Sequence, residues 1–385
     1  FVLDRRSGKL LKAHSIAYQN WTDGIDMATG RVSVRADQRR YLGKPKLLFP
    51  ATVGARNWTP GSLDPATGLY ISSVVDMGNV LIADPTPQPH RPRALNMNMQ
   101  ILLTPNLAAI LPTLPPAVRA EIEKLPDFKR AIDKPFVSEL RAIDPATGAV
   151  KWSVPNLGWQ DRGGTLATAS NLLFIGDLAG NLKAYESNSG NAVASIPLGS
   201  SIMAAPMTYR IKGTQYLAVT TGWGGGGWPY VPPYSAAFQR GNENRLIVLK
   251  VDGKKPVLPP LLPAVEPAPP PPAQLPGTTP ARLLKGQTLF FSNCAICHAN
   301  QPRSPSPDLR RMEPATHQAF HEIVLNGLYQ PNGMPAWKDI LSPADADAIH
   351  AWLIDQQAKA HAQETELVKQ GKPIGSTQAV IMAAN

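Results

Sequence analysis

The sequence predicts a multidomain protein in which an all-β region is followed by a small all-α domain. Three features support this prediction. A glycine-containing turn motif recurs between short alternating strands in roughly the first 250 residues, a proline-dominated segment follows, and the residues after it have helical spacing. The chain has 385 residues, which is enough for more than one domain.

The recurring motif is Asp-x-x-Ser/Thr-Gly. It begins at Asp4, Asp26, Asp64 and Asp144, with a degenerate copy at Glu186. In such a hairpin turn the acid accepts backbone N–H bonds and the glycine adopts a positive φ. Four-stranded units at roughly 40-residue spacing are typical of propeller blades. The spacing here is irregular, so we expect long insertions, including one at about 81–140 that contains a helix around Pro116–Lys124.

The clearest copy of the motif lies in the segment Ala142–Trp152. An alanine and a tryptophan ten residues apart bracket the turn there. We expect these two side chains to dock between neighbouring sheets.

Composition sets the domain boundaries. Residues 1–253 form the strand-rich portion, and 254–280 contain eleven prolines. Such a segment is extended and semi-rigid, so we interpret it as a linker rather than a recognition peptide. Residues 281–358 form the helical domain, and 359–385 are a tail that begins with helical spacing and ends small and polar.

The helical domain contains Cys294-Ala-Ile-Cys297-His298. Two thiols three positions apart and followed by a histidine indicate c-type haem attachment. Cys294 and Cys297 would form thioethers, and His298 is placed to ligate the iron. Half of a zinc site or a redox dithiol are the alternatives. Zinc needs further ligands, whereas the chain has only these two cysteines, and a redox pair does not need His298.

Met334 is the candidate for the second axial ligand. It lies in the Gly/Pro loop 330–337 rather than on a helical apolar face. His/Met ligation raises the haem potential and suits electron transfer. The alternative is that Met334 only packs in the loop and that His317, His321 or His350 ligates instead.

Two helices should frame this domain. Gly286, in the helix that leads into the haem motif, has no side chain and permits a close crossing. The expected partner begins at Ser342, a good N-cap, with Asp345 at the capping-box position. Its apolar stripe consists of Ile349, Trp352 and Leu353.

Charge and hydropathy limit the partners. The formal net charge is +10, but the basic residues are scattered and form no nucleic-acid motif. A basic electron donor that docks on an acidic redox protein fits this charge, and so does a merely solvated surface. No apolar run is long enough for a membrane span. Haem with thioether links is normally attached outside the bacterial cytoplasm, so we expect a periplasmic location.

Two known families share these features. Roughly residues 279–358, including Ser306–Leu309, resemble class I cytochromes c. The strand-rich portion resembles the quinoprotein dehydrogenases, whose eight-bladed propellers carry pyrroloquinoline quinone (PQQ). The segments that carry this resemblance are Phe1–Lys9, Gly54–Trp58, Ala142–Trp152, Gly163–Ala169, Met203–Tyr209 and Gly222–Gly225. A cytochrome after such a propeller is similar to the quinohaemoprotein, or type II, alcohol dehydrogenases.

The resemblance implies that residues 1–253 are the C-terminal part of a propeller. Because the chain starts at Phe1, within an expected strand, we interpret it as the C-terminal portion of a longer polypeptide. The family's catalytic aspartate, calcium ligands and paired cysteines belong to the first half of the propeller and have no counterpart here. The catalytic residues are therefore expected upstream of Phe1.

The resemblance also implies a function and further site residues. The family oxidises an alcohol with PQQ and calcium, and electrons pass to haem c and then to an acceptor such as a cytochrome or a blue-copper protein. Asn57 and Trp58 match an Asn-Trp pair that contacts the quinone, although a turn residue and a blade-core tryptophan are the alternative. The family often shows Trp-Asn-Gly-Gly where this chain has Trp159–Gly164, so Trp159 and Asp161 are candidates at the substrate mouth.

Two other functions fit the same features. One is an electron-transfer or binding protein with a non-catalytic propeller and a cytochrome. The other is a relative that acts on a different substrate, such as a polymer alcohol or a cyclic amine, as lupanine hydroxylase does.

Overall fold

A computed structural model describes residues 1–39, 43–83, 86, 89–90, 92, 96, 99–224, 230–298 and 301–375. Parts of the expected insertion between residues 84 and 98, Gly225 of the family resemblance and the end of the expected tail lie outside these residues. The chain divides into two compact units. Unit 1 comprises residues 1–85, 100–227 and 234–262, and unit 2 comprises 86–99, 228–233 and 263–385.

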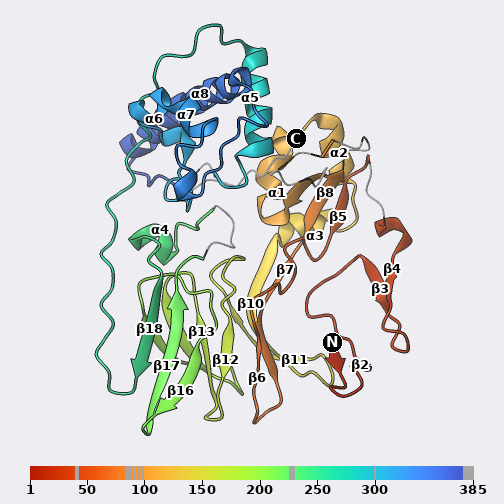
Figure 1. Ribbon diagram of the computed structural model, residues 1–385. Coiled ribbons are helices and arrows are strands. Elements are labelled where there is room, and N and C mark those ends of the chain that lie inside the picture. Colours follow the sequence, from red (N-terminus) through yellow and green to blue (C-terminus); the bar gives the residue numbers. More distant parts are fainter. Residues whose placement is uncertain are drawn as a thin grey trace. The chain divides into compact units, whose positions relative to one another are not determined.

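Unit 1 is rich in antiparallel sheets (Figure 1). The first large sheet has the order β11-β10-β7-β6, from β6 Ser62–Leu63, β7 Tyr70–Met77, β10 Phe136–Ile143 and β11 Val150–Pro155. The second has the order β12-β13-β14-β15, from β12 Thr165–Ala167, β13 Leu172–Gly176, β14 Asn181–Glu186 and β15 Ala192–Pro197. These two four-stranded units match the blades that the turn motif predicts.

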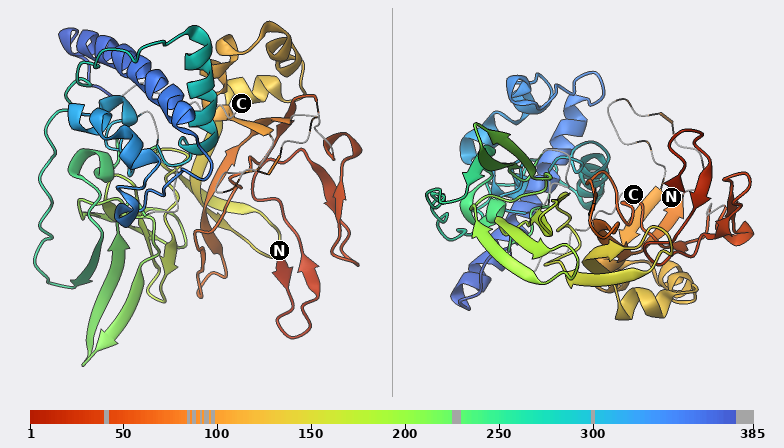
Figure 2. Two further views of the ribbon diagram at one scale, coloured as in Figure 1. Left: turned by 45° about the horizontal axis from the view of Figure 1, so that its top comes forward. Right: turned by 90° about the horizontal axis from the view of Figure 1, so that it is seen from below.

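The remaining sheets of unit 1 are smaller. The next one contains three strands, β16 Met207–Ile211, β17 Thr214–Thr221 and β18 Arg245–Lys250, with α4 Ala236–Arg240 before the last strand. Near the N-terminus lie two hairpins and a short 3₁₀ turn: β1 Val2–Leu3 with β2 Leu10–Lys12, β3 Thr22–Ile25 with β4 Val32–Val34, and η1 Ala36–Gln38. Figure 2 shows the sheets from two further directions.

Between β7 and β10 the chain leaves the first sheet. This segment contains β8 Asn79–Ala83, β9 Met99–Leu103, α1 Thr104–Ile110, η2 Leu111–Thr113, α2 Pro116–Glu123 and α3 Phe128–Asp133. Strands β8 and β9 join β5 Lys46–Leu48 in a separate sheet, and α2 confirms the expected helix. The segment has its own apolar core, made of Leu47, Phe49, Val80, Leu102, Leu107, Ile110, Leu111, Ile122 and Ala131.

The repeated turns have the geometry that the motif predicts. In the copy at Asp144, the carboxylate accepts the backbone N–H of Ala146 at 2.8 Å and the hydroxyl of Thr147 at 2.8 Å. Gly148 closes the turn at φ +76°. Hydrogen bonds from the Thr147 side chain and the Ala146 backbone hold the pKa of Asp144 below its usual value. The motif therefore encodes its own turn locally.

The expected docking of Trp152 is confirmed. Ala142 and Trp152 lie opposite each other in the pairing of β10 with β11. The Trp152 indole donates its N–H to the Ser187 carbonyl at 3.1 Å, in the turn that follows β14 of the next sheet. A Cβ at Gly190 would lie 2.7 Å from the Trp152 ring, so only glycine allows this approach. The tryptophan thus joins two neighbouring sheets.

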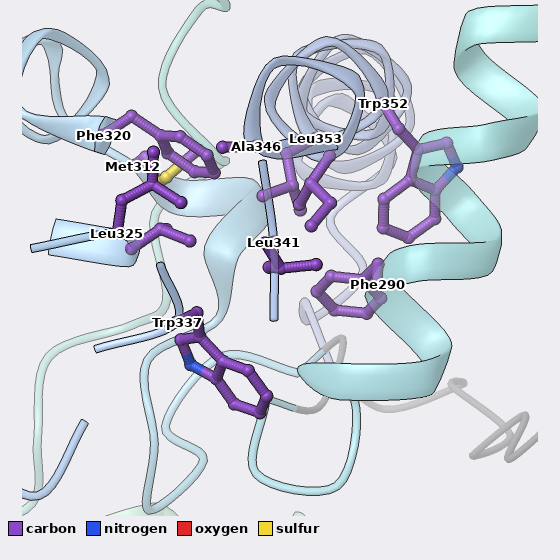
Figure 3. Packing of buried hydrophobic residues seen from close by; sticks show 11 residues of the cluster. Phe290, Met312, Phe320, Leu325, Trp337, Leu341, Ala346, Trp352 and Leu353 are labelled. Atoms are coloured by element: carbon purple, nitrogen blue, oxygen red, sulfur yellow. The ribbon is translucent and has the colours of Figure 1, made fainter. Parts of the chain in front are cut away.

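Unit 2 is helical. It contains α5 Pro280–Asn293, η3 Leu309–Arg311, α6 Pro314–Gln318, α7 Phe320–Val324, η4 Gln330–Asn332 and α8 Pro343–Lys369. Figure 3 shows its apolar core, in which Phe290 of α5 faces Trp352 of α8 with ring centroids 4.7 Å apart. The buried residues are Phe290, Met312, Phe320, Val324, Leu325, Trp337, Leu341, Ala346, Ile349, Trp352 and Leu353.

Helix α8 crosses α5 at Gly286, as the sequence predicts. A Cβ on Gly286 would lie 1.9 Å from the Ala348 carbonyl oxygen, so the two backbones touch there. At the start of α8, the Asp345 N–H donates to the Ser342 hydroxyl at 3.2 Å. The Ser342 N–H donates to the Asp345 carboxylate at 3.0 Å, which completes the capping box.

The second part of the proline-rich segment lies along α8. Glu364, which is buried, accepts the Ala268 N–H at 2.8 Å, and Gln357 donates to the Pro269 carbonyl at 3.1 Å. The Ala351 carbonyl accepts the side-chain amide of Gln274 at 3.0 Å. These hydrogen bonds attach an extended segment without helix or strand to α8. The proline-rich composition of the segment did not indicate this attachment. We refer to residues 263–279 as the strap.

None of the helices within the described ranges has an apolar stretch long enough to cross a bilayer.

Candidate haem and quinone sites

The Cys-x-x-Cys-His motif forms a compact turn at the end of α5. Cys294 is the C-cap of this helix, and its N–H donates to the Phe290 carbonyl at 2.8 Å. The Cys294 carbonyl then accepts the N–H groups of Cys297 at 3.1 Å and His298 at 3.0 Å. The helix and this turn therefore bring the two thiols and the imidazole of the motif to one place.

The two cysteines have different surroundings. Neither forms a disulfide; Cys294 is half-buried against the apolar core and Cys297 is exposed. Burial, together with the neighbouring Cys297, raises the pKa of Cys294 to about 12. The chain has only these two cysteines, so a zinc site here would lack further thiolate ligands.

The orientation of His298 leaves one ring nitrogen available. Its Nδ1 lies 2.8 Å from the Pro307 carbonyl oxygen. Because a carbonyl can only accept, Nδ1 must carry the proton in the neutral ring, and the Nε2 lone pair is free for a metal. A hydrogen bond of this kind to the far nitrogen is the usual way in which a ligating histidine is oriented.

Met334 lies against the same apolar core as Cys294. Its N–H donates to the Tyr329 carbonyl at 3.2 Å, after the turn η4 and Gly333, which has φ +94°. Two groups forty positions apart in the sequence are thus brought to one apolar surface. The half-buried Met334 thioether is thus positioned by a loop and does not lie on the apolar face of a helix.

The three alternative histidines have other partners. Nδ1 of His317 lies 2.8 Å from Nε2 of His350, and Nε2 of His317 lies 2.9 Å from the Gln357 side-chain oxygen. Both nitrogens of His317 are therefore occupied. Nε2 of His321 lies 2.8 Å from the Asp347 carboxylate. The His350 ring stacks on the Phe320 ring, with centroids 4.2 Å apart. These contacts favour Met334 over the histidines.

The quinone candidates lie in the loop that follows β5. The Asn57 side chain donates to the Val53 carbonyl at 3.1 Å. Trp58 is 56% exposed, so it is not a blade-core residue. An exposed indole beside an amide can cover a planar ligand and hydrogen-bond to its edge. The local geometry fits the role that the family resemblance suggests.

The Asp161 carboxylate is held by backbone N–H groups. Its two carboxylate oxygens accept the N–H groups of Leu178 at 3.0 Å and Leu157 at 3.2 Å. Burial and the nearby Asp177 raise its pKa to about 6. Trp159, two residues earlier, is half-buried. Asp161 therefore fixes the loop that carries both residues, whatever it contributes to a substrate mouth.

Comparisons with known proteins match both parts of the chain. Residues 38–217 match the model of the glucose/ethanol/alcohol dehydrogenase β-propeller domain, and residues 281–353 match that of cytochrome c oxidase, cbb3-type, subunit III. A quinohemoprotein alcohol dehydrogenase, ADH IIB from Pseudomonas putida, is 33% identical over 93% of this chain and 48% of its own length. The chain is thus similar to quinohaemoprotein alcohol dehydrogenases in both of its parts, the propeller blades and the cytochrome.

Two further proteins are similar to this chain. The solved structure of quinohemoprotein alcohol dehydrogenase ADHIIG from Pseudomonas putida HK5 has a TM-score of 0.77 and 30% identity, covering 96% of this chain and 51% of that one. Lupanine 17-hydroxylase [cytochrome c] from Pseudomonas sp is 28% identical over 95% of this chain and 48% of its own length. The chain spans about half the length of the curated relatives it matches.

Two features of the structure were not predicted from the sequence. One is Arg162, a buried side chain whose signal was present in the unusual segment Trp159–Gly164. The other is the set of polar residues on α8 that bind the strap, among them Gln357 and Glu364, which look like an ordinary solvated helix face. Within the described parts of the chain, no three His, Cys, Asp or Glu side chains gather to hold a metal ion.

Proposed function

We propose that this protein takes part in the PQQ-dependent oxidation of an alcohol or a related substrate and passes the electrons through haem c to an external acceptor. The observation that supports this is the presence, in one chain, of quinoprotein blades and a Cys-x-x-Cys-His turn whose Cys294 shares an apolar surface with Met334. When bound, PQQ supplies two-electron oxidation and haem c supplies one-electron transfer.

In the cytochrome unit, the proposed roles follow from the contacts. Cys294 and Cys297 would hold the haem through thioethers, and His298 would offer Nε2 to the iron because its Nδ1–H is held by the Pro307 carbonyl. Met334 would offer its thioether as a second iron ligand. Met334 is half-buried against the apolar core, and His/Met ligation in apolar surroundings would favour a high potential.

In the propeller unit, Asn57 and Trp58 are the proposed quinone contacts. The amide offers a hydrogen bond and the exposed indole offers a flat surface. Calcium is part of the proposal through the family alone. Trp159 and Asp161 remain proposed residues of the substrate mouth, and the base that accepts the alcohol proton is not among these residues.

We further propose a periplasmic location, since c-type haem is attached outside the bacterial cytoplasm. A cytochrome or a blue-copper protein is the proposed acceptor, and the net charge of +10 favours an acidic one.

The test is the visible absorption of the haem in the protein supplied with PQQ, calcium and a panel of alcohols that includes polymer alcohols and a cyclic amine. Haem reduction that requires both the quinone and one class of substrate would support the proposal and identify the substrate class. A c-type haem spectrum that no substrate changes would instead support an electron carrier with a non-catalytic propeller.

A further inference from the structure

Arg162 is a buried cation, and no carboxylate among the described residues pairs with it. Its side chain is 7% exposed. Among the described residues it makes one long hydrogen bond, from Nη1 to the Val53 carbonyl at 3.4 Å, and its buried Nε has no hydrogen-bond partner there. Burial lowers the pKa of Arg162, and no nearby carboxylate offsets this effect.

Two other arginines of low exposure, one buried and one half-buried, are paired with carboxylates. Arg310 contacts Asp308 at 2.7 Å, in a pair that is almost fully buried. Arg141 contacts Glu139 at 2.8 Å. Burying a charge without a partner is costly, and such a charge normally pairs with an opposite one. Arg162 is therefore as buried as the ion-paired Arg310, but no carboxylate of the described residues accompanies it.

The location of Arg162 indicates where an anion would come from. The Val53 carbonyl that accepts from Arg162 also accepts from the Asn57 amide, at 3.1 Å. Both side chains thus converge on one atom, and exposed Trp58 follows Asn57 directly. A ligand that contacts Asn57 and Trp58 lies within the reach of the Arg162 guanidinium.

The backbone on the C-terminal side of Arg162 is fixed. A Cβ on Gly163 would lie 2.3 Å from the Gly176 carbonyl oxygen, so this loop lies directly on β13. The Thr165 N–H donates to the Pro60 carbonyl at 3.1 Å, which joins the loop to the segment after Trp58. Arg162 therefore occupies a preorganised position and not a mobile surface site.

We propose that Arg162 binds a carboxylate group of a ligand held beside Asn57 and Trp58. This inference rests on the proposed function, because that function places a ligand there. The planar guanidinium can donate two parallel hydrogen bonds to a carboxylate, which a lysine cannot. The carboxylate belongs either to the quinone, which carries such groups, or to an acid-bearing alcohol substrate.

The experiment compares the wild type with Arg162→Gln and Arg162→Lys. PQQ and its trimethyl ester, which lacks the negative charges, are titrated into the calcium-containing protein, and binding is followed by tryptophan fluorescence. In parallel, KM and kcat are measured for a hydroxy acid, its methyl ester and a neutral alcohol. Arg141→Gln is the control, because it removes a half-buried arginine whose carboxylate partner, Glu139, is part of the chain.

If the quinone supplies the carboxylate, Arg162→Gln weakens PQQ binding about ten- to a hundredfold, as expected for a lost charge-assisted hydrogen bond. Binding of the ester stays the same, and Arg162→Lys recovers only part of the affinity. If the substrate supplies it, PQQ binding is unchanged and KM for the hydroxy acid rises by a similar factor, while KM for the ester and the neutral alcohol does not.

The assignment is overturned if Arg162→Gln changes neither the PQQ affinity nor the hydroxy-acid KM, even if the variant melts earlier than the wild type. Equal losses for acid and ester forms overturn it too, since they indicate a steric or structural effect. A wild type that binds no quinone and oxidises no substrate overturns the proposed function as well, so the two failures are distinguishable.

Discussion

Gly286→Ala tests the helix crossing that supports the haem turn. In an isolated helix this change is favourable by about 1 kcal/mol, because alanine has the higher helix propensity. Here the new Cβ would lie 1.9 Å from the Ala348 carbonyl oxygen and 2.9 Å from Cβ of Trp352. An ordinary carbon–oxygen contact needs about 3.3 Å, so the helices must move apart by roughly 1 Å or more.

Overpacking costs about 1–3 kcal/mol, and the upper part of this range, about 2–3 kcal/mol, applies here because backbone cannot turn aside as a side chain can. The cost therefore exceeds the gain in propensity, and we expect a net loss of about 1–2 kcal/mol. For a domain of this size, that corresponds to a fall in Tm of roughly 5–15 °C.

The assay is thermal unfolding of the haem-loaded protein, followed by circular dichroism in the Soret band. Leu284→Ala on the same helix is the control, because Leu284 is 60% exposed and should change stability by no more than about 0.5 kcal/mol. A Gly286→Ala protein that melts above the wild type would refute the close crossing, since helix propensity alone would then determine the outcome.

Four further predictions follow. Met334→Ala should lower the haem potential, on the order of 0.1 V within the roughly 0.8 V that axial ligands span; an unchanged potential in a redox titration would exclude Met334 as a ligand. Asn57→Ala should weaken PQQ binding about fivefold, for one lost hydrogen bond, in the fluorescence titration, and normal affinity would remove it from the site. Burial, together with His317, lowers the pKa of His350 to about 4, so the unfolded chain takes up a proton below about pH 6.5 while the folded one does not. Stability should thus be constant above that pH and fall by roughly 2–3 kcal/mol towards pH 4 in urea titrations, with a flatter profile in His350→Gln. Glu364→Ala removes the acceptor of the Ala268 N–H and should release the strap, seen as faster proteolysis of residues 263–279; an unchanged cleavage rate would show that this carboxylate does not hold it.

Features encoded by a few neighbouring residues could be predicted from the sequence. The capping box at Ser342 and the turn at Asp144 are local hydrogen-bonded structures, so their residue types determine them. The roles of Gly286 and Trp152 could also be predicted. A glycine within a helix permits a close crossing, and a tryptophan at a fixed distance from a turn can dock on the next sheet. The Cys-x-x-Cys-His turn belongs to the same class.

Contacts between distant segments could not be predicted in this way. Gln357 belongs to a helix whose sequence is compatible with a solvated face, yet it binds backbone carbonyls of the strap and the imidazole of His317. Arg162 was visible only as a departure from a family pattern, because its burial is a property of the folded chain. The separate core of the inserted segment likewise depends on the pairing of β5 with β8, which lie far apart in sequence.

The measurement that tests the account most directly is the rate of haem reduction after rapid mixing of the PQQ- and calcium-loaded protein with its substrate. If quinone and haem act within one molecule, the haem α-band should appear in a first-order step whose rate constant does not depend on protein concentration. A haem that stays oxidised, or a rate that rises in proportion to protein concentration, would contradict intramolecular electron transfer from the propeller to the cytochrome.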